Sequence, residues 1–478
     1  MQKGEGIGMK VISSSNSNNK NMLPWLVSFG LFMENLDSTV INTAIPQMAH
    51  SLAVNPLSLK LAVTSYLLSL ILFMPISGYL ADKLGTKRIF ISAITVFTFG
   101  SLLCGLSTSL TMLIIARIIQ GIGGAMMVPT GRLILVKTFE KSAMVNALSN
   151  MAVIGQIGPA FGPLLGGALT SYLSWHWVFL INLPIGALGI FFAYRWINEN
   201  HTTKTPAFDS KGFILFGVGL VTINLFLTLT NNSAISFRLL EVSLIIGIIS
   251  LVTYYFYAKN KTYPMISFSP FKTHTFKVAV LGSLWIRITV NSLPFILPLL
   301  LQVNFGYSAF ISGLLILPYG LGLISAKFII KSLLRYLGYR RILLINPCII
   351  AFIVLCFAYL NPMSSIFLIV FLCFFAGLAC SIQFSSMQTL NYIDIKDQEK
   401  SKATSLASVF QQLAMNLGVC LTALSLEFFN VPLKPQKTLI SLHAFHHSFI
   451  FLALVAVSST IVFQMLRKTD GLSAFQAN

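Results

Sequence analysis

Residues 78–88 read GYLADKLGTKR, and the last five of them, LGTKR, have an echo in LGYRR at residues 337–341. Both copies follow a long apolar segment and end in two basic residues. We expect each copy to lie at the cytoplasmic exit of the second helix in a set of six. The repeat therefore predicts two six-helix halves, an arrangement in which transporters place a site between the halves at the middle of the membrane.

The composition is that of a membrane protein. Of the 478 residues, 55% are hydrophobic and 9% are charged, whereas soluble domains carry about 25% charged residues. We therefore expect an all-α polytopic protein in a lipid bilayer. The net charge is +19, but no continuous stripe of basic and aromatic residues occurs, which argues against a nucleic-acid partner.

Fourteen apolar stretches are long enough to cross about 30 Å of hydrocarbon. The expected spans are 22–44, 61–80, 89–107, 110–131, 143–170, 175–194, 212–230, 238–257, 278–301, 309–329, 342–360, 363–390, 403–426 and 445–466. The expected divisions are a disordered N-terminus at 1–21, an N-terminal bundle at 22–200, two inserted helices at 201–260, a C-terminal bundle at 261–470 and a tail at 471–478.

The positions of the Lys and Arg residues predict the orientation. With a cytoplasmic N-terminus, the cytoplasmic segments hold 26 of the 32 basic residues and the external segments hold four. The remaining two, Arg117 and Arg287, lie inside spans. Because an excess of Lys and Arg marks cytoplasmic loops, both termini are expected in the cytoplasm.

The first span carries two carboxylates in the stretch FMENLDSTVINTAIP, residues 32–46. A charge at the centre of a membrane helix costs about 2.5–3.5 kcal/mol, so such groups usually face a cavity and have a function. Glu34 and Asp37 are three residues apart and share one face of the helix. Burial and mutual repulsion favour protonation of one of them. The alternative is that both point into a water-filled vestibule without a specific role.

Two arginines lie inside spans. Arg117 begins RIIQGIGGAMMVP (117–129) in the fourth span, too far from the helix end for its side chain to reach the interface easily. A cation near the carboxylates of the first span would stabilise their ionised form, and its withdrawal would favour proton uptake. We expect Arg287 to face a central cavity, either in substrate or proton coupling or in a structural partnership.

The fifth span contains GQIGPAFGPLLGG, residues 155–167. Three of its glycines recur every four residues, so they line one face on which another helix packs closely. A proline follows two of these glycines, removes a helical hydrogen bond and allows a bend. The residues of this motif are Gly155, Gly158, Pro159, Gly162, Pro163, Gly166 and Gly167.

These stretches resemble signatures of the major facilitator superfamily. GYLADKLGTKR resembles the loop after its second helix, and the resemblance implies that Asp82 takes part in a cytoplasmic charge network that holds one conformation. RIIQGIGGAMMVP resembles its helix 4 motif, which implies that Arg117 assists proton transfer. The residues of the implied latch are Gly78, Asp82, Gly85 and Arg88.

Further stretches narrow the resemblance. The helix 5 motif resembles the antiporter signature of the superfamily's exporters, which implies an interface that favours export. LDSTVINTAIP (36–46) and WHWVFLINLPIG (175–186) resemble segments of the 14-helix drug:proton antiporters. The likeness is to multidrug transporters of bacterial inner membranes and is looser in the second half. It implies the major facilitator fold, a bacterial inner-membrane location and a monomer, which is the superfamily's usual form.

The leading hypothesis is a proton-coupled exporter of amphipathic drugs or related small molecules that works by alternating access. The strings G-x-x-x-x-G-K-[ST], H-E-x-x-H and G-x-S-x-G do not occur, so we expect no enzyme, no cofactor and no metal site. Asp37 would take up a proton outside and release it in the cytoplasm, while Glu34 shares that proton or binds a cationic drug. The candidates for the substrate cavity are Arg287, Gln120 and Asn42.

Two alternatives remain open at this point. A proton-coupled importer of a small metabolite would not need the helix 5 motif. A membrane sensor that does not transport would need a soluble signalling domain, and the loops between the spans are too short to form one.

Overall fold

The computed structural model describes residues 17–139, 141–198, 207–230, 235–396, 399–430, 440–467 and 470. Within these residues the regular structure is helical and no strand occurs, which confirms the predicted all-α fold. The predicted tail at 471–478 and most of the predicted disordered N-terminus lie outside the described residues.

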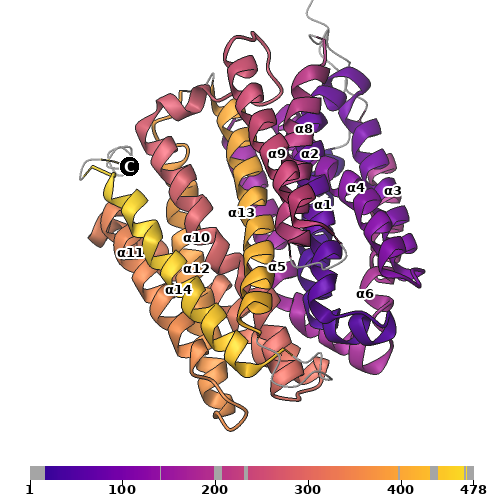
Figure 1. The fold of residues 1–478 in the computed structure, drawn as a ribbon. Coiled ribbons are helices and arrows are strands. Elements are labelled where there is room, and N and C mark those ends of the chain that lie inside the picture. The colour runs from indigo at the N-terminus through magenta and orange to yellow at the C-terminus, as the bar shows by residue number, and fades with distance from the viewer. Residues whose placement is uncertain are drawn as a thin grey trace, which may run out of the picture.

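The helices form two groups that stand side by side, with α8 and α9 over the line where the groups meet (Figure 1). The first group has α1 Ser17–Ser51, α2 Lys60–Leu84, α3 Thr86–Gly105, α4 Leu110–Thr138, α5 Lys141–Tyr172, α6 Trp177–Leu180 and α7 Asn182–Trp196. The inserted helices are α8 Ser210–Leu229 and α9 Phe237–Lys259. The second group has α10 His274–Leu299, α11 Ala309–Ala358, α12 Ile366–Leu390, α13 Lys400–Phe429 and α14 Leu442–Gln464. Short turns of other helix types are η1 Pro56–Leu59, η2 Ser269–Lys272 and η3 Leu300–Asn304.

Each predicted span falls largely on helical residues, with the sixth on α6 and α7 together and the tenth and eleventh both on α11. Eleven helices of the described residues are long and apolar enough to cross a membrane. The prediction of a polytopic membrane protein is therefore confirmed. The number fourteen and the divisions near residues 200 and 261 stay predictions.

The two copies of the sequence repeat adopt the same backbone turn. Gly85 separates α2 from α3 with φ 95° and ψ 142°, and Gly338 interrupts α11 with φ 72° and ψ 164°. A side chain is strongly disfavoured in this region of backbone space, so glycine is needed at both places. The repeat therefore marks the same turn after the second helix of each half.

Helix α5 packs tightly between α1 of its own half and α11 of the other half. A Cβ added to Gly158 would lie 2.8 Å from a backbone nitrogen of α1, and one added to Gly162 would overlap the side chain of Thr39. On the opposite side, a Cβ added to Gly320 of α11 would overlap the backbone of Ala160. The close packing predicted for the helix 5 glycines is thus confirmed, and their partner is α1.

The inserted helices cover the line where α2 meets α13. Asn224 of α8 donates through Nδ2 to Oδ1 of Asn416 in α13 at 2.7 Å. Buried apolar side chains join the same helices with α9 and α10: Ile71, Phe216, Leu220, Tyr254, Phe276, Leu406 and Val409. The pair α8 and α9 therefore contacts both halves.

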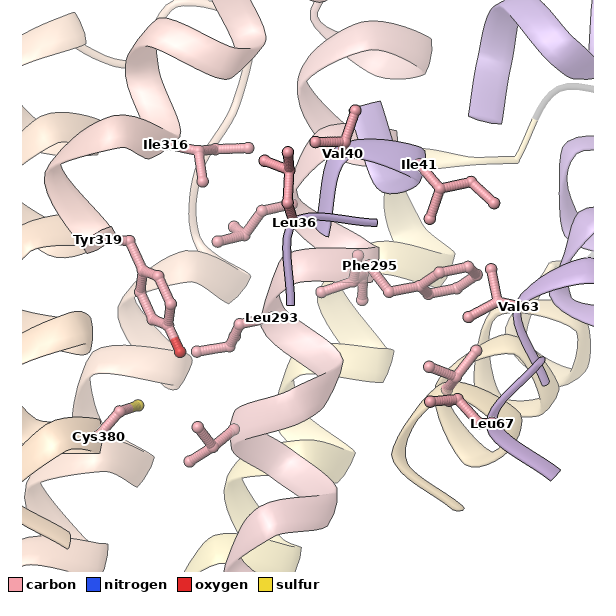
Figure 2. Close-up of a cluster of buried hydrophobic side chains, with 14 of the residues drawn as sticks. Leu36, Val40, Ile41, Val63, Leu67, Leu293, Phe295, Ile316, Tyr319 and Cys380 are labelled. Atoms are coloured by element: carbon pink, nitrogen blue, oxygen red, sulfur yellow. The ribbon is translucent and has the colours of Figure 1, made fainter. Parts of the chain in front are cut away.

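Between the halves, apolar side chains meet at the centre of the molecule. Figure 2 shows Leu36 and Val40 of α1 facing Leu293 of α10 and Ile316 of α11, with no charged group among the labelled side chains. All four are buried. The two halves therefore share an apolar contact at the centre of the molecule.

The glycine contacts of the second half yield a stability prediction. A Cβ added to Gly377 of α12 would overlap the backbone of Tyr319, whereas one added to Gly217 of α8 would meet only Leu72 Cδ2 at an ordinary 3.6 Å. Both Gly→Ala changes gain similar helix propensity, so their difference isolates overpacking, which costs about 1–3 kcal/mol. We expect Gly377→Ala to melt several degrees below Gly217→Ala when thermal unfolding is followed in detergent. Equal melting temperatures would contradict the packing described here.

Candidate functional site

A buried ion pair joins α1 to α4 at the centre of the first half. Arg117 Nη1 donates to Asp37 Oδ2 at 2.5 Å, and neither side chain is exposed to solvent. Gln120 Nε2 donates to the other carboxylate oxygen at 2.8 Å, and Asn182 Nδ2 of α7 donates to the same oxygen at 3.2 Å. Asp37 therefore accepts hydrogen bonds from three side chains, an arrangement that suits its ionised form.

The surroundings of Arg117 compensate for its burial. Its guanidinium lies 4.1 Å from the ring centre of Tyr66 and 5.6 Å from that of Phe179, distances at which a cation is attracted to the ring face. Its Nε donates to the carbonyl oxygen of Ala62 at 3.3 Å. Its Nη1 also donates to Gln120 Oε1 at 2.7 Å, so the arginine has four partners besides the carboxylate.

Close helix packing brings the polar groups of this site together. A Cβ added to Gly100 of α3 would lie 2.6 Å from the backbone of Gln120 in α4, so only glycine permits this approach. The next residue, Ser101, accepts hydrogen bonds at its Oγ from Gln120 at 2.6 Å and from Asn182 at 3.2 Å. Sequence reasoning missed Ser101, Tyr66 and the contact of Asn182. The signal for Asn182 was its position in WHWVFLINLPIG.

Glu34 lies one turn before Asp37 in a different environment. Its Oε1 accepts a hydrogen bond from Gln412 Nε2 of α13 at 3.3 Å. Its Oε2 is buried and has no hydrogen-bond partner among the described residues. The side chain therefore contacts the second half through one carboxyl oxygen, while the other oxygen accepts no hydrogen bond from the described part of the chain.

The three candidates for the substrate cavity are in different places. Gln120 is fully buried in the hydrogen-bond network of Asp37. Asn42 is buried and donates to the Ser38 carbonyl oxygen of its own helix at 3.3 Å. Gln120 therefore contacts the ion pair, and Asn42 does not.

Arg287 of α10 is a buried cation that forms no ion pair with any described residue. It is 8% exposed, its Nε donates to Ser283 Oγ at 2.8 Å, and its guanidinium lies 4.0 Å from the ring centre of Phe384 in α12. A buried cation without a carboxylate is costly. The remaining donors of Arg287 are therefore available for an anionic group.

The residues of the predicted latch lie where α2 meets α3 and α4. Asp82 Oδ1 accepts from Lys137 Nζ of α4 at 2.9 Å, in a partly exposed ion pair. Gly85 makes the turn into α3, and a Cβ added to Gly78 would meet no described atom within 4 Å. Arg88 follows in the first turns of α3. Asp82 thus connects α2 to α4 of its own half.

Polar contacts join the halves at the side predicted to be external. Lys60 Nζ of α2 lies 2.7 Å from Glu427 Oε1 of α13, and Gln302 Nε2 donates to the Thr43 carbonyl oxygen at 3.0 Å. The Lys60 side chain is only 5% exposed. These contacts hold the two halves together at that side.

The last glycine of the helix 5 motif packs against the second half at the same side of the molecule. A Cβ added to Gly167 would overlap the backbone of Ala309 at the start of α11. One turn later, Ser171 Oγ accepts a hydrogen bond from the backbone N–H of Phe310 at 3.0 Å. The motif therefore faces α1 with most of its glycines and contacts α11 of the second half at Ala160, Pro163 and Gly167.

Comparison with known proteins identifies a family. A family model described as Major Facilitator Superfamily matches residues 27–419 and, in a second match, residues 279–472. The chain is 37% identical over 446 residues to the "Putative multidrug resistance protein MdtD" of Enterobacter sp. (strain 638), covering 93% of this chain and 94% of that protein. The protein of the same name from Pectobacterium carotovorum subsp. carotovorum (strain PC1) is 40% identical over 408 residues, which is 85% of this chain and 87% of that protein.

Solved structures with the same fold are more distant in sequence. A POT family transporter crystallised with 5-aminolevulinic acid aligns with a TM-score of 0.69 at 13% identity, over 94% of this chain and 96% of that one. The nucleoside transporter NupG aligns with a TM-score of 0.64 at 14% identity, over 94% of this chain and 98% of that one. At this identity the likeness shows the fold alone.

The ion pair at the external side yields a prediction on conformation. Lys60→Glu or Glu427→Lys alone places like charges together in a largely buried site, where a broken pair costs about 3–5 kcal/mol. We expect each single variant to favour the conformation with an open external side and the double variant to restore closure. The measurement is labelling of a cysteine introduced at Thr43 by a membrane-impermeant maleimide, corrected for the native cysteines.

Both single variants should be labelled several-fold faster than the wild type. The control is Glu241→Lys, a charge reversal at an exposed position of α9, which should leave labelling unchanged. Labelling of the double variant at the rate of the single variants would show that the Lys60–Glu427 pair does not hold the external side closed.

Proposed function

The chain belongs to the major facilitator superfamily, and we propose that it is a proton-coupled exporter of amphipathic drugs or related small molecules. It is a multi-pass membrane transporter and not an enzyme. The proposal places it in the bacterial inner membrane with both termini in the cytoplasm, as the distribution of Lys and Arg predicts. The name of the bacterial relatives supports drugs as the substrate class. The helix 5 motif supports export over import.

The observation that carries proton coupling is the contrast between two carboxylates one turn apart on α1. Asp37 is paired with Arg117 at 2.5 Å, whereas Oε2 of Glu34 is buried without a hydrogen-bond partner among the described residues. Glu34 forms no ion pair within the described residues; only the more distant charge of Arg132 and the donor of Gln412 compensate it. An ionised carboxylate with weak compensation is costly away from water, so Glu34 is the better proton holder in this conformation. Asp37 can hold a proton only after Arg117 moves away.

The two carboxylates then form a relay. With the external side open, Arg117 withdraws from Asp37, and Asp37 takes up a proton from outside. When the ion pair re-forms, the proton moves to Glu34, which lies one turn nearer to the predicted cytoplasmic end of α1. Release from Glu34 into the cytoplasm completes the inward movement of the proton, and the substrate moves outward in the same cycle.

The proton gradient supplies enough free energy for export. One charge that crosses a potential of ~150 mV yields about 3.4 kcal/mol. This free energy supports a substrate gradient on the order of 300-fold for each proton. A single proton site therefore suffices for useful efflux.

The relay predicts that both carboxylates are needed for coupling. In everted membrane vesicles, addition of a substrate should release protons from the acidified interior with the wild type and not with Asp37→Asn. We expect Glu34→Gln to lower the rate by about tenfold or more, as loss of a positioned proton-transfer group does. The measurement uses a pH-sensitive dye and a panel of cationic and anionic compounds. Glu241→Gln, which removes an exposed carboxylate of α9, is the matched control and should behave as the wild type.

Asp37→Asn that couples as well as the wild type would contradict the role of Asp37 and leave Glu34 as the sole carrier. Glu34→Gln that couples as well as the wild type would contradict the relay.

The unpaired cation predicts a preference among substrates. If Arg287 contacts the anionic group of a substrate, Arg287→Gln should lower export of anionic compounds several-fold and leave cationic compounds nearly unchanged. Arg287→Lys should retain part of the anionic transport because it keeps the charge. Vesicle uptake assays with both classes of compound measure this ratio. An equal loss for both classes, with a lower melting temperature, would instead assign Arg287 to the structural partnership with Phe384.

A further inference from the structure

A second region with unusual charge lies away from the buried ion pair. A pocket of about 760 Å³ opens where the predicted cytoplasmic ends of α9, α10 and α13 meet η2. The described residues that line this pocket include no carboxylate. They include five lysines: Lys259, Lys261, Lys272, Lys277 and Lys402.

The positive charge of the pocket is largely uncompensated. Only Lys261 has an ion-pair partner among the described residues, Asp209 Oδ1 at 2.6 Å. The hydrogen bonds with Asp209 and Tyr257 raise the pKa of Lys261 above its usual value, so this lysine stays charged at neutral pH. The preference of basic residues for cytoplasmic loops accounts for lysines on this side of the membrane. It does not account for five of them around one concavity.

Part of the pocket lining is aromatic and apolar. Phe268, Phe271 and Phe410 line it, and the ring centres of Phe271 and Phe410 are 5.5 Å apart in an edge-to-face contact. Leu281, one turn beyond Lys277 along α10, extends the apolar lining further into the membrane. The pocket lining therefore combines lysines with aromatic and apolar side chains.

The pocket also borders the lipid. Tyr255 of α9 lines it and is 47% exposed. Its neighbours on the outer face of the same helix, Val252 and Phe256, are exposed as well. Because these apolar side chains lie on a membrane-spanning helix, they contact acyl chains. A lipid can therefore reach the pocket from the side without leaving the bilayer.

We propose that this pocket binds an anionic phospholipid of the cytoplasmic leaflet. The lysines surround the phosphate headgroup, and the phenylalanines contact the glycerol and the upper part of the acyl chains. Basic pockets between membrane helices on this side recognise such headgroups in this way. The bound lipid would join α9 to α10 and α13 and so fix the inserted helices on the second half. This inference does not depend on the proton relay or on the direction of transport.

The test compares two triple variants of the purified full-length chain. Lys272→Gln with Lys277→Gln and Lys402→Gln removes three charges from the pocket. Lys331→Gln with Arg335→Gln and Arg341→Gln removes three charges from exposed positions of α11 outside it. Binding of phosphatidylglycerol and of phosphatidylcholine is counted by native mass spectrometry, and the melting temperature is measured with each lipid and with inorganic phosphate.

We expect the wild type and the α11 triple to retain phosphatidylglycerol and to melt several degrees higher with it than with phosphatidylcholine. The pocket triple should lose at least half of the bound phosphatidylglycerol and most of the shift. Should that variant fail to fold, each single pocket substitution is expected to lower retention in part.

Three outcomes would overturn the proposal. Equal losses in both triples would show general attraction to basic residues. An equal shift with inorganic phosphate would identify a site for free anions. No preference for phosphatidylglycerol in the wild type would exclude an anionic lipid site.

Discussion

The ion pair between Asp37 and Arg117 is the constraint on which the first half depends. Two charges withdrawn from water are stable together when further donors, acceptors and aromatic rings surround them. Here the support comes from Gln120, Asn182 and Tyr66, which lie on α4, α7 and α2. Because several helices contribute to the same pair, the pair can open only if these helices move relative to each other. In the proposed relay, proton uptake at Asp37 is therefore linked to a change of helix positions.

The two halves have similar turns after their second helices, but their buried arginines have different partners. Gly85 and Gly338 make the same turn with positive φ, so the helix connections match. In the first half, a cation on α4 meets a carboxylate on α1. In the second half, Arg287 on α10 lies over Phe384 of α12 with no carboxylate partner among the described residues. The first half thus has the groups that the proposed relay needs, and the second half has a buried cation without an ion pair among the described residues.

The sequence predicted the features that depend on local pattern. The spacing of Gly158, Gly162 and Gly166 predicted one tightly packed helix face. The repeat at 84–88 and 337–341 predicted equivalent positions in two halves, and its two glycines have similar positive φ angles. The sequence could not identify α1 as the helix that packs on that face, because any helix can pack closely against a face of glycines. Nor could it separate Glu34 from Asp37. Their different environments come from contacts with distant helices, such as the hydrogen bond from Gln412.

In the proposed relay, that hydrogen bond makes the protonation of Glu34 depend on the position of the second half. Gln412 Nε2 reaches Glu34 Oε1 from α13 at 3.3 Å, and the same helix carries Glu427, which pairs with Lys60 at the external side. A displacement of α13 that breaks the external ion pair therefore also changes the hydrogen bonding of Glu34. An ionised Glu34 gains more from a donor than its protonated form does, so loss of Gln412 favours proton binding there. In the proposed relay, closure of the external side therefore brings the Gln412 donor to Glu34 and favours release of its proton, so that α13 links closure to the last step of proton transfer.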